Sequence, residues 1–185
     1  MTSTQTERIV TTWTIDPAHS EVEFAVKHMM ITTVKGWFAD VEGTVVTDER
    51  HPSKSRVEVT IDAASINTRA ADRDTHLRSG DFFDVERWPH ITFRSTRIDG
   101  ATDREGESFR IIGDLTIRDV TREVTLDATF EGRGQAMGGE RASFTATGKI
   151  DRREFGLKWN QALEAGGVLV SNDVKMNVSV QLVRE

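Results

Sequence analysis

The sequence contains no cysteine. Disulfide bonds, thiolate nucleophiles and thiolate metal sites are therefore excluded, and the absence by itself leaves the cellular compartment open. It also lacks a basic run, and its net charge is −6. Nucleic-acid binding depends on a basic footprint, so this charge argues against a nucleic-acid partner.

The chain has no long apolar segment either. No stretch approaches the roughly 20 apolar residues of a membrane-spanning helix, so we expect no integral membrane segment. The first residues, MTSTQTERIVTTW, lack the apolar region of a secretory signal, which predicts a cytoplasmic location. Residues 1–12 are polar and are expected to be flexible, and 13–185 are expected to form a single domain.

Apolar and polar residues alternate along most of the chain. From Ser20 to His28, one face carries Val22, Phe24 and Val26, which is the period of a half-buried strand. The pattern predicts an antiparallel all-β protein of about eight strands. A closed barrel is favoured because one face of each strand is polar and because closure removes exposed edges. The other expected strands are residues 36–47, with a bend near Phe38, then 56–63, 90–98, 108–117, 124–130, 142–150 and 174–182.

One segment between strands does not alternate. It predicts a short helix at about residues 68–79, capped by Asn67 or Thr68 and ended by Gly80. Aromatic residues follow the helix, and we interpret the whole segment as a lid over an apolar interior. Residues 151–172 are irregular, with one helical turn expected near Trp159–Leu163. Trp159 either covers the second end of the barrel or packs a loop.

A barrel of eight strands either fills with side chains or holds one ligand. Small residues are mixed with large apolar ones on the inward faces, which favours a cavity: Gly113, Ala128, Ala142, Ala146 and Gly148. The alternative for the glycines is close approach by a neighbouring chain segment. At about 3.3 Å per residue and a tilt of about 40°, the barrel would be roughly 30 Å tall, enough for an extended lipid chain.

The inward faces supply the expected ligand contacts, although plain core packing is the alternative for each residue. The expected pore lining is Phe24, Val26, Val59, Ile61, Phe93, Ile111, Leu115, Leu126, Phe130, Phe144 and Met176. Four polar residues are expected at the mouth, where they could meet a head group: His28, Arg73, His76 and Arg152. The alternatives are a histidine bonded to backbone for His28, and ion pairs of the arginines with Asp74 or Asp84.

Catalysis and metal binding have weak support. His76 lies near several aspartates, but zinc sites need several ligands at fitting spacing, and the sequence has no H-E-x-x-H motif. The serines stand in no G-x-S-x-G context. We therefore expect no catalytic residues and no metal site.

These residues resemble the YceI-like family over nearly the whole chain. The opening WTIDPAHSEVEFAVKH is similar to the family's first segment, and Gly36 and Phe38 follow as its G-x-F motif. LTIRDVTREV matches a second motif, with Asp119 where glycine is usual. A further motif includes Ile150, Arg152, Phe155 and Gly156, with Asp151 where asparagine is expected. The lid segment carries the most specific match, through Ser65, Thr68, Arg73, Asp74, His76, Leu77, Phe82, Phe83, Pro89 and Phe93.

The resemblance implies a lipocalin-like barrel that binds a polyisoprenoid. It predicts non-enzymatic binding and transport of a long-chain isoprenoid or similar amphipathic lipid, with an isoprenoid quinone or polyprenyl diphosphate as possible ligands and no other cofactor. Alternatives are an enzyme that acts on such a lipid through His76 or His28, and a filled barrel that acts as an interaction module. Many family members are exported to the periplasm, whereas no export signal is evident here. A homodimer is possible, since dimers are familiar in the family.

Overall fold

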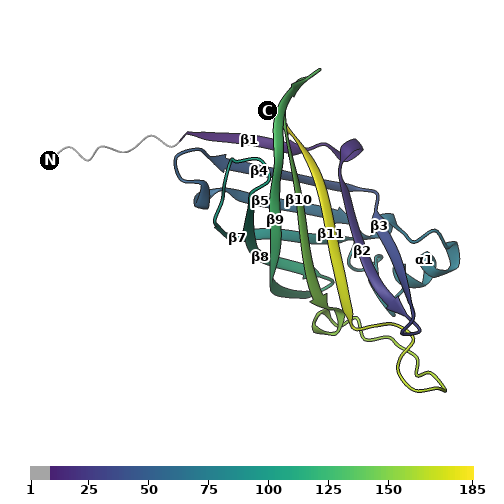
Figure 1. The fold of residues 1–185 in the computed structure, drawn as a ribbon. Helices are drawn as coiled ribbons and strands as arrows, with labels where there is room; N and C mark the ends of the chain where they lie inside the picture. The colour runs from purple at the N-terminus through teal and green to yellow at the C-terminus, as the bar shows by residue number, and fades with distance from the viewer. Residues whose placement is uncertain (1–8) are drawn as a thin grey trace.

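The computed structural model describes residues 9–185 and consists mostly of antiparallel strands (Figure 1). Within these residues the single α-helix is α1, Ala71–Arg78. The strands are β1 (Val10–Ile15), β2 (Glu21–His28), β3 (Thr32–Phe38), β4 (Val41–Asp48), β5 (Arg56–Asp62), β6 (Ile66–Asn67), β7 (His90–Asp99), β8 (Ser108–Ile117), β9 (Val120–Ala136), β10 (Gly139–Asp151) and β11 (Asp173–Arg184). Short 3-10 turns are η1 (Pro17–His19), η2 (Pro52–Lys54), η3 (Ala63–Ser65) and η4 (Arg152–Phe155).

Eight of these strands close into a ring, in the order β1-β4-β5-β7-β8-β9-β10-β11, with β11 pairing back to β1. All of the pairings are antiparallel, and Trp13 of β1 lies opposite Arg184 of β11. The predicted eight-stranded antiparallel barrel is therefore confirmed. Closure leaves these strands no open edge for another chain to pair with.

The first six strands in the chain are the halves of three longer strands, each of which is interrupted by a bend. β11 pairs with β1 through its last residues and with β2 through Lys175–Ser179, so β1 and β2 continue each other across η1. In the same way, β3 and β4 are joined at Ala39–Asp40, which is the bend expected near Phe38. β6 pairs with β3 but has no pairing with β7, and the chain from Thr68 to Pro89, including α1, connects the two strands.

The barrel therefore has two different ends. The end that carries α1, the β2–β3 turn (29–31) and the loop 156–172 is called the lid end here. The end that carries the turns β4–β5 (49–55), β7–β8 (100–107) and β9–β10 (137–138) is called the hairpin end. Figure 1 shows the β2–β3 turn and the yellow-green loop at the same edge of the molecule, beside α1.

Three local predictions need correction. The helix begins at Ala71, after the extended residue Ala70, because Asn67 and Thr68 are still part of β6 or its exit. The helical turn of the late segment is η4, at Arg152–Phe155, and not at Trp159–Leu163, where a bridge between Ala162 and Val168 forms instead. Residues 10–12 belong to β1, ahead of the expected domain start at 13, while residues 1–8 lie outside the described part.

The inward apolar side chains form one continuous core. Its largest fully buried side chains are Trp13, Ile66, Phe155 and Leu182, which come from both ends of the barrel. A register shift opposite Ser143–Phe144 leaves Glu131 without a partner in the ladder. Because a bulge reverses the inward and outward sides, Arg133 turns over Trp13, with its guanidinium 5.2 Å from the ring centre.

Candidate functional site: the barrel interior

The interior of the barrel is hollow. A chamber of about 430 Å³ lies at the lid end and another of about 900 Å³ at the hairpin end. Both chambers are bordered by Val22, Ile61, Leu115 and Met176, so they meet at the middle of the barrel. A single water occupies about 30 Å³ of liquid, and ligand pockets span roughly 300–1,000 Å³. The filled-barrel alternative is therefore wrong.

All of the predicted lining residues border these chambers. The lid-end chamber is bordered by Phe24 and Val26. Ile61, Leu115 and Met176 border both chambers. The remaining predicted residues border the hairpin-end chamber: Val59, Phe93, Ile111, Leu126, Phe130 and Phe144. The alternation of each strand places them inward, and their contact with a ligand remains a prediction.

The glycines expected to leave room do not do so. A Cβ on Gly113 would lie 2.5 Å from the carbonyl oxygen of Arg94 and 2.6 Å from the ring of Phe93. A Cβ on Gly148 would lie 2.8 Å from Leu126. These positions accommodate neighbouring groups, as in the close-approach alternative. Ala128 and Ala146, by contrast, do border the hairpin-end chamber.

The lid is fixed to the barrel by a buried polar cluster at Thr68. The carboxylate oxygen Oδ1 of Asp74 accepts hydrogen bonds from the Thr68 backbone N–H (2.8 Å) and hydroxyl (2.5 Å). Arg73 donates from Nε to the Thr68 hydroxyl (2.8 Å) and from Nη2 to the Thr68 carbonyl (2.7 Å). Arg73 also borders the lid-end chamber. Its tie to the barrel therefore runs through Thr68, and the expected ion pair with Asp74 or Asp84 is wrong.

His76 joins the lid to the late loop. Its ring lies edge-on to Phe82 (centroids 5.1 Å apart) and to Trp159 (4.7 Å). Its Nε2 lies 2.8 Å from the carboxylate of Asp81. Trp159 therefore packs at the lid end and does not cover the second end of the barrel. His76 and Trp159 both border the lid-end chamber.

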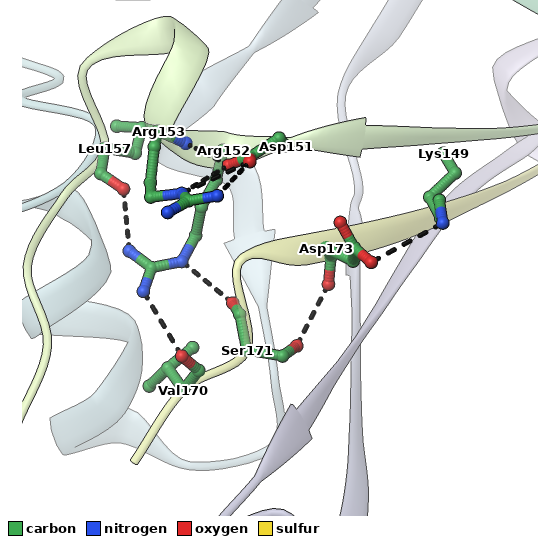
Figure 2. A network of polar contacts seen from close by, with 8 residues as sticks. All are labelled: Lys149, Asp151, Arg152, Arg153, Leu157, Val170, Ser171 and Asp173. Atoms are coloured by element: carbon green, nitrogen blue, oxygen red, sulfur yellow. Dashed lines mark hydrogen bonds and ion pairs between the residues drawn. The ribbon is translucent and has the colours of Figure 1, made fainter. Parts of the chain in front are cut away.

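Arg152 is a buried cation whose hydrogen-bond partners are backbone carbonyls (Figure 2). Only 4% of its surface is exposed, and burial lowers the pKa of its guanidinium below the ordinary arginine value. The predicted ion pair with Asp74 or Asp84 is wrong here too, because Asp74 is bound to Thr68 and Asp84 to Arg87. Its guanidinium donates to the carbonyls of Leu157 (2.6 Å), Trp159 (2.9 Å), Val170 (3.3 Å) and Ser171 (2.9 Å). Arg152 thus holds both sides of the late loop against the chamber.

His28 lies where the parity of β2 places it, at the edge of the lid-end chamber. Its backbone forms a bridge with Val170, and the N–H of Met29 donates to the carbonyl of Leu169 (2.8 Å). The four predicted mouth residues are therefore gathered at one end of the barrel. Their contact with a head group remains a prediction.

Sequence reasoning missed the polar rim of the hairpin-end chamber. Charged and hydroxyl side chains from the β4–β5 and β7–β8 turns, from the end of β4 and from β9 border it: Asp48, Glu49, Ser55, Thr102, Asp103, Arg104, Glu107 and Arg133. Asp48 is buried and accepts the backbone N–H groups of Arg50 and His51. The turns could be located from the sequence, but nothing in the pattern showed that they meet around one opening.

Among the described residues we find neither a cluster of metal ligands nor a membrane-spanning helix. Across residues 9–185, no three histidine, aspartate or glutamate side chains gather as metal ligands would. Within the same residues, none of the helical structure is both apolar and long enough to cross a bilayer. The feature that remains is the hollow apolar interior, closed on one side by the lid.

A closed eight-stranded antiparallel barrel with an apolar interior and a short helix at one end defines the lipocalin-like class of folds. Comparison with known families makes the assignment particular. The model of the YceI-like domain matches residues 13–182, and the chain belongs to this family.

Curated and solved relatives agree with this assignment. The chain is 39% identical to a UPF0312 protein of Staphylococcus aureus strain USA300, over 93% of this chain and 97% of that protein. It is 31% identical to the Campylobacter jejuni YCEI protein, with a TM-score of 0.71 over 86% of this chain and 89% of that one. A Saccharophagus degradans structure, described as a polyisoprenoid binding domain implicated in plant cell wall breakdown, shares the fold at 14% identity, with a TM-score of 0.68 over 94% of this chain and 98% of that one.

Proposed function

We propose that this protein binds a long-chain isoprenoid or similar amphipathic lipid inside the barrel and carries it without changing it chemically. The observation that carries the proposal is the pair of adjoining apolar chambers, of about 430 and 900 Å³. An apolar hollow of this shape suits an extended hydrocarbon chain, because chain contacts replace water along the whole lining. The polyisoprenoid-binding description of the Saccharophagus degradans neighbour is consistent with this ligand, although at 14% identity it supports the fold alone.

Contacts with the hydrocarbon chain are sufficient for tight binding. Larger ligands gain about 0.3 kcal/mol per heavy atom, so a chain of about 40 carbons would gain roughly 12 kcal/mol, which is near nanomolar affinity. Polar groups are then needed only to orient the ligand. Isoprenoid quinones and polyprenyl diphosphates both combine such a chain with a polar head.

The head group is proposed to lie at the lid end, beside His28 and Arg73. Both side chains border the chamber there. Arg73 donates to Thr68 through Nε and Nη2, and its Nη1 is the group proposed to meet the head. The other two predicted contacts, His76 and Arg152, are engaged by Asp81 and, through all three guanidinium nitrogens, by backbone carbonyls. We therefore assign His76 and Arg152 to positioning the lid and the late loop.

The test is mass spectrometry of an organic extract of the purified protein, with native mass spectrometry to count bound molecules. A stoichiometric isoprenoid, recovered with unchanged mass after incubation, is the expected result. A protein that arrives empty and takes up neither a quinone nor a polyprenyl diphosphate would overturn the proposal. Recovery of a chemically altered isoprenoid that is lost in His76→Ala, with binding retained, would instead favour an enzyme.

A further inference from the structure

We propose that the β2–β3 turn, Met29–Met30–Ile31, docks the lid end onto the surface of a lipid bilayer. The inference rests on the proposed function. It assigns the part of the barrel that would contact a membrane containing the lipid ligand. The turn is called the apolar tip below.

The apolar tip concentrates exposed apolar surface. In the described part of the chain, six large apolar side chains are strongly exposed, and three of them are consecutive here. Met29, Met30 and Ile31 are 46%, 59% and 74% exposed. Single exposed apolar residues are normal on a protein surface, whereas contiguous ones mark sites of interaction.

The backbone of the apolar tip adopts a strained conformation that methionine does not favour. Met29 and Met30 have φ values of +53° and +64°. This region suits glycine or asparagine and costs other residues of the order of 1 kcal/mol or more. Hairpin turns with positive φ usually carry Asn-Gly or similar pairs. An Asn-Gly pair at these two positions would therefore give a less strained and more polar turn than the two methionines do.

The apolar tip is joined directly to the mouth of the chamber. His28 precedes it and borders the lid-end chamber, as do Leu169 and Val170 of the late loop. The loop is bonded to the base of the tip, since Ser171 N–H donates to the carbonyl of Lys27 (3.0 Å). A lipid leaving a bilayer at the tip would therefore reach the chamber mouth without crossing open water.

The chemistry of the apolar tip fits a bilayer better than a protein partner. A stable protein interface buries about 800 Å² on each side, far more than one three-residue turn presents. Shallow insertion of a few apolar side chains is the usual anchoring of peripheral proteins, and a flanking cation adds attraction to anionic lipids. The exposed Lys27 lies in β2 close to the tip, where it would face the lipid head groups.

The test is flotation with vesicles of phosphatidylcholine alone and of phosphatidylcholine mixed with phosphatidylglycerol. The key variant is Met29→Asn with Met30→Gly, which removes both thioethers and relieves the backbone strain, so it should fold at least as well as the original chain. We expect it to lower vesicle binding about tenfold or more, since each 1.4 kcal/mol of lost burial is a factor of ten. Met137→Ser, which removes the 95% exposed methionine at the opposite end, is the matched control and should leave binding unchanged.

Uptake of a long-chain polyprenol from detergent solution, measured in parallel, separates this inference from the proposed function. Uptake retained by the tip variant, together with lost vesicle binding, supports both. Vesicle binding by a protein that takes up no polyprenol supports the docking site and overturns the carrier function. Equal flotation of the original and tip-variant proteins, or none by either, overturns the docking site, and so does a tip-dependent self-association without flotation.

Discussion

The two ends of the barrel differ in what they present to their surroundings. The lid end closes a smaller, largely apolar chamber with a helix and a loop, and it carries the exposed apolar tip. The hairpin end surrounds a larger chamber with charged turns, among them Asp103, Arg104 and Glu107. One sheet thus places a surface suited to lipid at one end and a surface suited to water at the other.

The two ends are also held together by different forces. At the lid end, Thr68, Asp74 and Arg152 are buried polar groups with specific partners, so the loss of one leaves others unsatisfied. At the hairpin end Asp48 is a buried polar group of the same kind, but the other charged contacts there, such as Arg104–Glu107 and Arg133–Glu140, are more exposed ion pairs, which usually contribute little. Stability should therefore be far more sensitive to substitution at the lid end, and the following predictions test that difference.

The largest effect is expected for Arg152→Ala. The substitution removes the donors that satisfy the carbonyls of Leu157, Trp159, Val170 and Ser171, and unsatisfied buried groups cost about 1–3 kcal/mol each. Because water will reach some of them, we expect a loss of about 3 kcal/mol in the free energy of unfolding, measured by urea denaturation. Arg104→Ala at the hairpin end is the control and should change it by less than about 0.5 kcal/mol. Equal effects at both sites would contradict the comparison.

A smaller effect is expected for Thr68→Val, which keeps the shape of the side chain. It removes the hydroxyl that donates to Asp74 and accepts from Arg73, and we expect the free energy of unfolding to fall by about 1–2 kcal/mol. Thr75→Val on the exposed side of the same helix loses only a bond to the Ala71 carbonyl and should be nearly neutral. If hydrogen exchange in α1 is unchanged by Thr68→Val, this cluster does not fix the lid.

Filling each chamber separately should show how far the ligand extends. Ala146→Phe adds a ring beside the hairpin-end chamber, and Val34→Phe adds bulk beside the lid-end chamber. A ligand that spans both chambers should lose about tenfold in affinity in either variant, in fluorescence titrations with a long polyprenol. A short isoprenoid such as farnesol should be affected by one variant only. Unchanged binding of both ligands in both variants would show that the interior is not the binding site.

The smallest effect is expected at Asp16, where η1 joins β1 to β2. Hydrogen bonds from His19 and Arg141 lower the pKa of its carboxyl below the ordinary 3.8. A lowered folded-state pKa stabilises the protein above the unfolded-state value, and this contribution is lost as the pH falls through the folded-state pKa. Asp16→Asn should therefore reduce stability at neutral pH and have little effect in strong acid, as measured by urea unfolding at the two pH values. A loss of the same size at both would rule out a contribution from the charge.

The alternation of apolar residues was sufficient to predict the fold and which apolar side chains face the interior. Val59 and Phe144 lie on strands that alternate throughout, and Phe93 precedes the register shift at Ser95–Arg97, so their inward direction follows from the sequence. Arg133 could not be placed, because the bulge at Glu131 reverses the parity of its strand and depends on pairing with a distant segment. The partners of Arg152 could not be predicted either, since they are backbone carbonyls, which every residue type carries.

β11 is the one strand on which both halves of the barrel depend. It borders β10 on one side, and β1 and β2 on the other. The pairs between β1 and β11 join residues far apart in the sequence, and such non-local contacts form late and slowly during folding. Until these pairs form, the facing edges of β1 and β11 and the apolar lining are exposed together. Conditions that delay this pairing should favour aggregation over refolding, even where the finished barrel is stable.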